Sequence, residues 1–246
     1  MERALKFVVR YLPWAVSLCL TIPFPLAMLN GCNRGDLRAV AGSACLQDSS
    51  QTPVSGTFSI VAVDPNTGVC DSAVASKYPA VGKVVPYVRA GVGAFCTQHW
   101  HNPPWGEHAL DLLAKGDLPE AVLAELLRDD PQRDKRQLAI IDMAGRAADR
   151  NPANADPSGI WWGAASGRYY ACQGNTLTGS GVIFVMARAY EQTKGSLADR
   201  LMAALVAGDK AGGDHRGRLA AGMRIAIRRA LTATGSNCTW TRAMML

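Results

Sequence analysis

Paired cysteines of the kind that bind zinc or form redox centres are missing from this chain of 246 residues. Its seven cysteines include no Cys-x-x-Cys pair and no zinc-type spacing. Cys70, Cys96 and Cys172 fall in apparent strands, where a cysteine usually acts as a small buried hydrophobe. The sequence therefore predicts three buried free thiols and leaves the redox state of the compartment open.

The body of the chain also lacks the basic surface that nucleic-acid-binding proteins carry. The net charge is +6, yet residues 57–215 hold 15 basic and 17 acidic side chains. The positive excess lies in residues 1–56 and 216–246 instead. We therefore expect no nucleic-acid partner.

The N-terminal apolar run is too short for a typical membrane-spanning helix, which needs roughly 20 residues. Residues 14–29 form an apolar run of 16 residues, broken by two prolines and preceded by three basic residues. This pattern is typical of a secretory signal peptide. The run ends in Leu-Asn-Gly-Cys at residues 29–32, which resembles a lipoprotein cleavage site with Cys32 as the lipidated residue. We expect residues 1–32 to direct export to the periplasm, with membrane attachment through Cys32 or soluble release as open alternatives.

Residues 33–56 have too few large apolar side chains to pack, and they predict a linker or propeptide. Residues 57–246 then suit a single domain with one core. Within it, period-2 runs group first into hairpins, and helical periods follow in pairs. This order predicts an α+β fold with helix pairs covering antiparallel sheets. We expect strands over 57–64, 69–76, 84–88, 91–98, 137–141, 160–164, 169–172 and from about 219, and helices over 105–114, 117–128, 181–192 and 197–207.

Several strings resemble a known bacterial family in their order and spacing. They are TFSIVAVDPNTG, AVASKYPAVGKVVPYVRAGVGAFCTQ, RQLAIID, YYACQGNTLTG and AGGDHRGRLAAG, spanning Thr57 to about Met223. The family is the domain of unknown function 1028, which is grouped with the N-terminal-nucleophile (Ntn) hydrolases. The resemblance implies a four-layer αββα sandwich. Residues 228–246 show no strand pattern, which predicts a truncated chain and an incomplete sheet at the C-terminus.

Thr57 is the candidate nucleophile, because it opens the first strand directly after Gly56. If the bond between them is cut, Thr57 carries both a hydroxyl and a free α-amine that can deprotonate it. In shorter members of the family, loss of the initiator methionine would expose the matching threonine. The oxyanion would need preorganised donors. Asn175, in a predicted loop, and the backbone near Gly91 and Gly93 are the candidates, although Asn175 also fits a simple turn residue.

Other polar residues are predicted near the threonine. Ser76 and Lys77 end the second strand, opposite the start of the first, where they could orient the terminal amine. Gln98 ends another strand and could reach the same place. Asp214 and Arg216, in a glycine-rich loop, could bind a polar substrate or form only a surface ion pair. The resulting hypothesis is a small amide or peptide substrate and no cofactor.

Two other function classes remain open at this stage. His99 and His101 would share a strand face with His108 nearby, and imidazoles of this kind suit zinc. The family resemblance gives no expectation of these histidines. The second alternative is a non-catalytic exported binding or envelope protein that keeps the Gly56–Thr57 bond intact.

Overall fold

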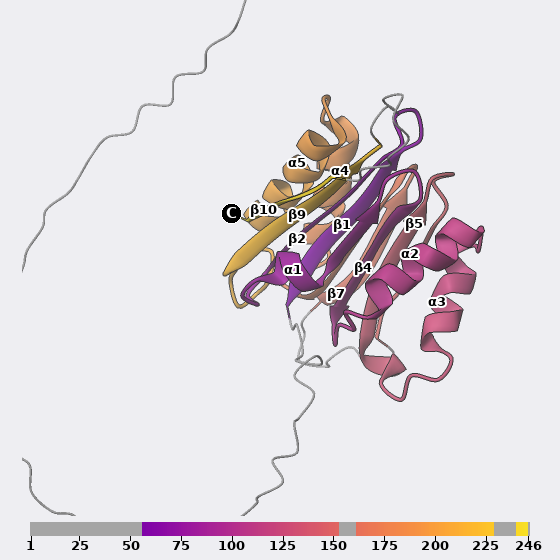
Figure 1. Cartoon of the computed structure of the whole chain (residues 1–246). Coiled ribbons are helices and arrows are strands. Elements are labelled where there is room, and N and C mark those ends of the chain that lie inside the picture. The colour runs from indigo at the N-terminus through magenta and orange to yellow at the C-terminus, as the bar shows by residue number, and fades with distance from the viewer. Residues whose placement is uncertain (1–55, 153–160, 229–239, 246) are drawn as a thin grey trace, which may run out of the picture. The chain divides into compact units, whose positions relative to one another are not determined.

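The computed structural model describes residues 56–152, 161–228 and 240–245. Within these ranges the chain has an α+β fold with two antiparallel sheets and five α-helices (Figure 1). The predicted signal peptide, Cys32 and most of the linker lie outside the described residues. No helix in the described ranges is long and apolar enough to cross a membrane.

The larger sheet has six strands, and β1 (Thr57–Asp64) lies near its centre. β1 pairs with β2 (Val69–Ser76) through a tight hairpin and with β8 (Tyr170–Leu177) on its other side. Thr57 is therefore opposite Ser76 in one ladder and opposite Asn175 in the other. The sheet order is β10-β9-β2-β1-β8-β7, with β7 at Trp161–Gly167, β9 at Ala220–Ile227 and β10 at Trp240–Met245.

The smaller sheet has four strands in the order β3-β4-β5-β6. Its central strands are β4 (Gly93–His99) and β5 (Arg136–Asp142), which pair along their whole length. The edge strands are short, as is usual for edges that must not pair further. They are β3 (Pro86–Arg89) and β6 (Ala147–Arg150), and the short helix α1 (Val81–Val84) precedes β3.

Three apolar cores hold the elements together. Phe58 and Ile60 of β1 face α4 (Gly181–Gln192) and α5 (Leu197–Lys210), whose apolar side chains complete the first core. Val61 faces the other way and packs with residues of β4 and β5 in the second core. The third core joins the smaller sheet to α2 (Trp105–Lys115) and α3 (Pro119–Leu127). Figure 1 shows these two helix pairs on opposite sides of the strands. β1 is thus buried on both faces.

Most predicted elements are confirmed, and the three thiols Cys70, Cys96 and Cys172 are buried and free. The predicted strand 84–88 begins later, because residues 81–84 form α1. Asp117 and Glu120 have the spacing of a capping box, which predicts Asp117 as the N-cap of α3; this is wrong, because Leu118 is the N-cap and no side chain caps the helix. Pro119 starts it instead, since its fixed φ suits a first turn and its missing N–H has no partner to lose there.

Two predicted boundaries are wrong in ways that affect the sheet. Asn175 lies in strand β8 and not in a loop, because its backbone pairs with Thr57. Residues 240–245 form strand β10, although no strand was predicted after residue 228. β10 pairs residue by residue with β9, and backbone pairing of this kind does not require an alternating sequence pattern.

Asp71 is a buried carboxyl at the middle of β2, on the face that packs against the helices. Neither carboxylate oxygen has a hydrogen-bond partner within the described part of the chain. Burial raises the pKa of Asp71 to about 8. The neighbouring Tyr190, also fully buried, has its pKa raised to about 12, first by burial and in a smaller part by Asp71. The folded protein therefore holds a proton on Asp71 at neutral pH.

This proton predicts a pH-dependent stability. Because the folded pKa lies above the unfolded one, the folded state binds one more proton between about pH 4 and pH 8. The free energy of unfolding should fall as pH rises through that window and stop falling above it. Asp71→Asn should remove most of this fall, up to about 5 kcal/mol. Urea unfolding at pH 5 and pH 8 measures it, and parallel pH profiles for the two proteins would contradict it.

Candidate active site

Thr57 lies at the N-terminal end of β1, between β2 and β8, with its side chain wholly buried. Its hydroxyl donates a hydrogen bond to Ser76 Oγ at 3.1 Å. Ser59, two residues on and on the same face, donates to Gln98 Oε1 of β4 at 2.7 Å. The Thr57 hydroxyl therefore points into the layer between the two sheets and not toward the helices.

Ser76 connects the Thr57 hydroxyl to the preceding peptide bond. Its hydroxyl donates to the Gly56 carbonyl oxygen at 2.6 Å. Ser76 Oγ in turn accepts from the Thr57 hydroxyl and from the Tyr78 backbone N–H, the latter at 3.0 Å. With two bonds accepted and one donated, the Ser76 hydroxyl has a fixed orientation. It polarises the carbonyl of the peptide bond whose other side carries Thr57.

Asn175, on the neighbouring strand β8, holds the backbone N–H of Gly56. Its side-chain oxygen accepts from the Gly56 N–H at 2.7 Å and from the Thr176 hydroxyl at 2.9 Å. Its nitrogen donates to Gln137 Oε1 at 2.8 Å. Thr176 has a φ of 53°, a region that β-branched residues rarely adopt. Such backbone strain often accompanies functional sites.

Two buried glutamine side chains, Gln137 and Gln98, hold Asn175 and its strand in place. Gln137 of β5 donates to the Gly174 carbonyl at 2.8 Å and accepts from Gln98 at 2.7 Å. Since Gln98 also accepts from Ser59, the network joins β1, β4, β5 and β8. A buried polar network whose members are satisfied is rigid. The Asn175 side chain is therefore held in one orientation.

Asp214 closes the site on the other side of Gly56. Its buried carboxylate accepts from the Lys77 N–H at 3.2 Å and forms an ion pair with Arg216 at 2.8 Å. Gly56 has a φ of 78°, which suits glycine. A Cβ at position 56 would lie 2.1 Å from Asp214 Oδ2 and 2.0 Å from Arg216 Nη2. Only glycine fits at this position as the loop stands.

The comparisons with known proteins concern this whole region. The model of a family of unknown function, DUF1028, matches residues 57–241. The chain belongs to this family. The DUF1028 match extends beyond Met223, near which the matching strings end. Among solved structures, the crystal structure of the DUF1028 protein SPO2555 from Silicibacter pomeroyi is similar, with 30% identity and a TM-score of 0.66 over 77% of this chain and 78% of that one. A search of curated proteins found no match.

The residues predicted from the sequence meet around Gly56 in this DUF1028 chain, but not all through their side chains. Lys77 contributes its backbone N–H, and its side chain is exposed. Gln98 acts one residue away, through Gln137. Gly91 donates its N–H to the Gly68 carbonyl, in the hairpin at the far end of β1, so its predicted oxyanion role is wrong. Direct contacts with the Gly56–Thr57 pair come from Ser76, Asn175, Asp214 and Arg216.

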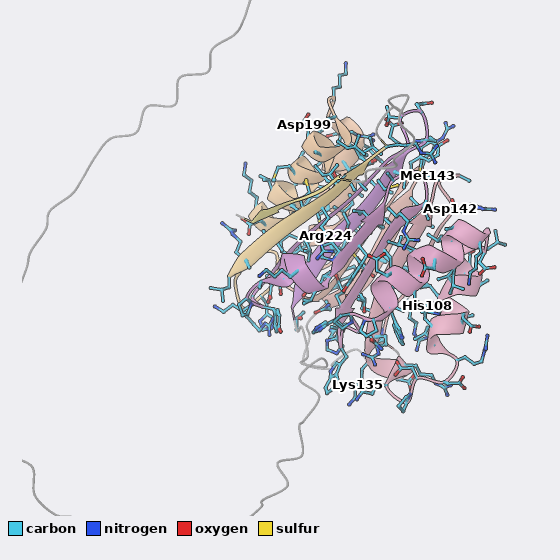
Figure 2. The ribbon with its side chains drawn as sticks, viewed as in Figure 1. His108, Lys135, Asp142, Met143, Asp199 and Arg224 are labelled. Atoms are coloured by element: carbon cyan, nitrogen blue, oxygen red, sulfur yellow. The ribbon has the colours of Figure 1, made fainter. Side chains whose placement is uncertain are left out.

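The three histidines do not come together as predicted. β4 ends at His99, which has a φ of 63°, so His101 lies beyond the strand. The His99 ring packs edge-on against the Trp162 ring, with 4.5 Å between the ring centroids. Burial lowers the pKa of His99 to about 4. His108 is exposed on α2 (Figure 2). Within the described ranges no group of three or more His, Cys, Asp or Glu could hold a metal ion.

Sequence reasoning missed Gln137 and Ser59. Gln137 directly precedes the apolar run Leu138–Ile141 in the same strand, and a buried glutamine there needs a partner. Ser59 shares the face of Thr57 at a spacing of two residues. Both signals were in the sequence, but neither shows which strands meet.

Proposed function

We propose that this DUF1028 protein is an exported amide hydrolase whose nucleophile is Thr57, freed when the Gly56–Thr57 bond is cut. One observation carries the proposal: Ser76 bonds both the Gly56 carbonyl oxygen and the Thr57 hydroxyl, and Asn175 holds the backbone N–H of the same Gly56. The start of an ordinary β-strand does not require a side-chain hydrogen bond to the carbonyl oxygen of the residue before it. The substrate is a small amide or a peptide.

The fold we propose is the four-layer αββα sandwich of the Ntn hydrolases. Three separate cores support it, because each is what one would expect between successive layers of helix, sheet, sheet and helix. The position of Thr57 at the end of a central strand, facing the layer between the sheets, supports it too.

The bond is cut by the protein itself in this proposal. Thr57 Oγ adds to the Gly56 carbonyl carbon; its proton passes to Ser76 Oγ as the Ser76 proton passes to the Gly56 oxygen. The C–N bond then breaks, and the Thr57 nitrogen takes that proton. This leaves Gly56 as an ester on Thr57 Oγ. Water hydrolyses the ester to a Gly56 carboxylate and a free Thr57 hydroxyl and amine.

The mature enzyme uses the new terminus. An unperturbed α-amine has a pKa of about 7.7–8.0, so it is partly free base at neutral pH and can take the Thr57 hydroxyl proton. Thr57 Oγ then attacks a substrate amide, the amine leaves, and water resolves the acyl-threonine. This cycle requires no cofactor. It takes place in the periplasm, with the protein soluble or attached through a lipid on Cys32.

Replacing the nucleophile tests the cleavage of the precursor. Wild-type protein recovered after export should begin at Thr57, whereas Thr57→Ala should keep residues before position 57. Thr97→Ala, which removes another buried threonine hydroxyl, should be cut like wild type. Intact mass and N-terminal sequencing measure all three.

Two outcomes would overturn the proposal. A wild-type terminus at Cys32 with the linker still attached would favour a non-catalytic binding protein. Cutting of Thr57→Ala at the wild-type rate would mean that another protease makes the cut.

A further inference from the structure

Gly56 is held at Thr57 as a bound acyl group would be. Its carbonyl oxygen accepts from Ser76, and its N–H donates to Asn175 Oδ1 at 2.7 Å. Its α-carbon lies against the Asp214 carboxylate and the Arg216 guanidinium. The N–H and the carbonyl oxygen of Gly56 therefore both have hydrogen-bond partners. The Asp214 and Arg216 side chains form a wall beside its α-carbon.

The wall leaves no room for a side chain of the L configuration. A Cβ would lie 2.1 Å from Asp214 Oδ2 and 2.5 Å from Asp214 Cγ, far inside contact distance. Asp214 cannot easily move aside, because its side chain is unexposed and accepts from Lys77 N and from three nitrogens of Arg216. Its backbone is fixed as well, by a bridge to Leu177.

The same oxygen attacks in both reactions of the proposed function. When Thr57 cuts its own chain, the acyl group on Oγ is Gly56. When it turns over a substrate, the acyl group on Oγ is the substrate's. Ser76 bonds that oxygen, and Asn175 and Asp214 contact the residue whose carbonyl carbon it attacks in the precursor. The contacts of Gly56 therefore describe the acyl site that its departure opens.

We propose that the substrates are N-acylglycyl amides, including peptides with glycine on the acyl side of the cleaved bond. This inference rests on the proposed function. The substrate glycine takes the place of Gly56: its N–H donates to Asn175, its carbonyl accepts from Ser76, and its unsubstituted α-carbon faces Asp214. Thr57 Oγ bonds to the glycyl carbon, the C–N bond breaks, and the leaving amine takes the proton that the Thr57 amine removed. Water then releases N-acylglycine.

Three chromogenic probes test the acyl site on the matured protein. They are the 4-nitroanilides of N-acetylglycine, N-acetyl-L-alanine and butyric acid. The alanyl probe adds the methyl group that meets Asp214, and kcat/KM should fall roughly 100-fold, as expected for overpacking a rigid site. The butyryl probe keeps the methylene group but lacks the N–H that would donate a hydrogen bond to Asn175. Its kcat/KM should fall at least about 10-fold relative to the glycyl probe.

Two variants distinguish the steric effect of Asp214 from a general loss of activity. Asp214→Ala removes the carboxylate and also the group that holds the Arg216 side chain in place, so that side chain is free to move away. The glycyl-to-alanyl ratio should therefore shrink toward unity even if overall activity drops. Asp209→Ala removes an aspartate on α5 that pairs with Arg218 instead, and the ratio should stay at the wild-type value. Cleavage of the precursor gives a readout without substrate: Gly56→Ala should mature at least about 10-fold more slowly than wild type.

The outcomes distinguish the two proposals. Equal hydrolysis of the glycyl and alanyl probes would overturn the glycine inference and leave Thr57 as the nucleophile. A protein that matures at Thr57 but hydrolyses none of the probes would likewise overturn the glycine inference alone. A wild-type chain that keeps its Gly56–Thr57 bond and hydrolyses no probe would overturn both.

Discussion

Ser76→Ala should slow cleavage of the Gly56–Thr57 bond by a factor of roughly 100 to 1,000, the usual cost of losing one oxyanion donor. The Ser76 hydroxyl donates to the Gly56 oxygen at 2.6 Å and accepts from Thr57 Oγ. Its removal takes away the donor on the carbonyl and the relay for the Thr57 proton at once. A time course of intact mass on freshly synthesised precursor measures the rate.

Ser72→Ala is the matched control for this change. Ser72 lies on the same strand and the same face as Ser76 and is equally buried, but its hydroxyl contacts Cys96 Sγ at 3.0 Å. The control variant should therefore mature at the wild-type rate. Cleavage of Ser76→Ala as fast as Ser72→Ala would mean that Ser76 only fills space. A folded state of both variants, checked by urea unfolding, excludes a trivial loss.

The position of Ser76 could be predicted from the sequence, because a hairpin fixes its own register. The turn between β1 and β2 has the residues of a tight reversal, and counting outward from it puts Ser76 opposite Thr57. Local patterns of this kind also gave the helix pairs and the α+β class. In each case the residues that specify the structure are close in sequence.

Asn175 shows where local reasoning stopped. Gly174 to Gly179 has the composition of a loop, and that composition predicts a loop when read alone. The structure instead continues β8 to Leu177, because β1, more than a hundred residues earlier, offers an unpaired edge. The same pairing decides the chemistry: it turns the Asn175 oxygen, and not its nitrogen, toward Gly56. A side-chain donor to an oxyanion was predicted there, whereas the observed contact accepts.

Gln137 shows a second limit, since its role depends on two sheets meeting face to face. The sequence marks it as a polar residue in an apolar strand, but its partners come from β4 and β8. No spacing within one segment specifies such a contact. Its neighbour Arg136 is also a buried polar residue of β5, and its replacement is expected to lower stability more.

Arg136→Ala should lower the free energy of unfolding by about 3–5 kcal/mol, the usual cost of breaking a buried ion pair from one side. Only 1% of the Arg136 side chain is exposed, and two of its nitrogens bond the Asp130 carboxylate at 2.7 and 3.0 Å. A third donates to the Trp100 carbonyl at 2.6 Å. Without the guanidinium, Asp130 keeps a charge with little access to water, and the backbone after β4 loses its partner. Thermal and urea unfolding measure the loss, expected as roughly a 10 °C drop in Tm.

Arg150→Ala is the control, because Arg150 pairs with Asp134 at a site where both side chains reach solvent. An exposed pair of this kind contributes less than about 1 kcal/mol. The double change Arg136→Ala with Asp130→Ala should recover part of the loss, since no charge is then buried alone. Equal losses for Arg136→Ala and Arg150→Ala would contradict the prediction. Because Arg136 precedes Gln137 on β5, its loss should also loosen the amide network beneath Asn175, and slower maturation at Thr57 would accompany the lower stability.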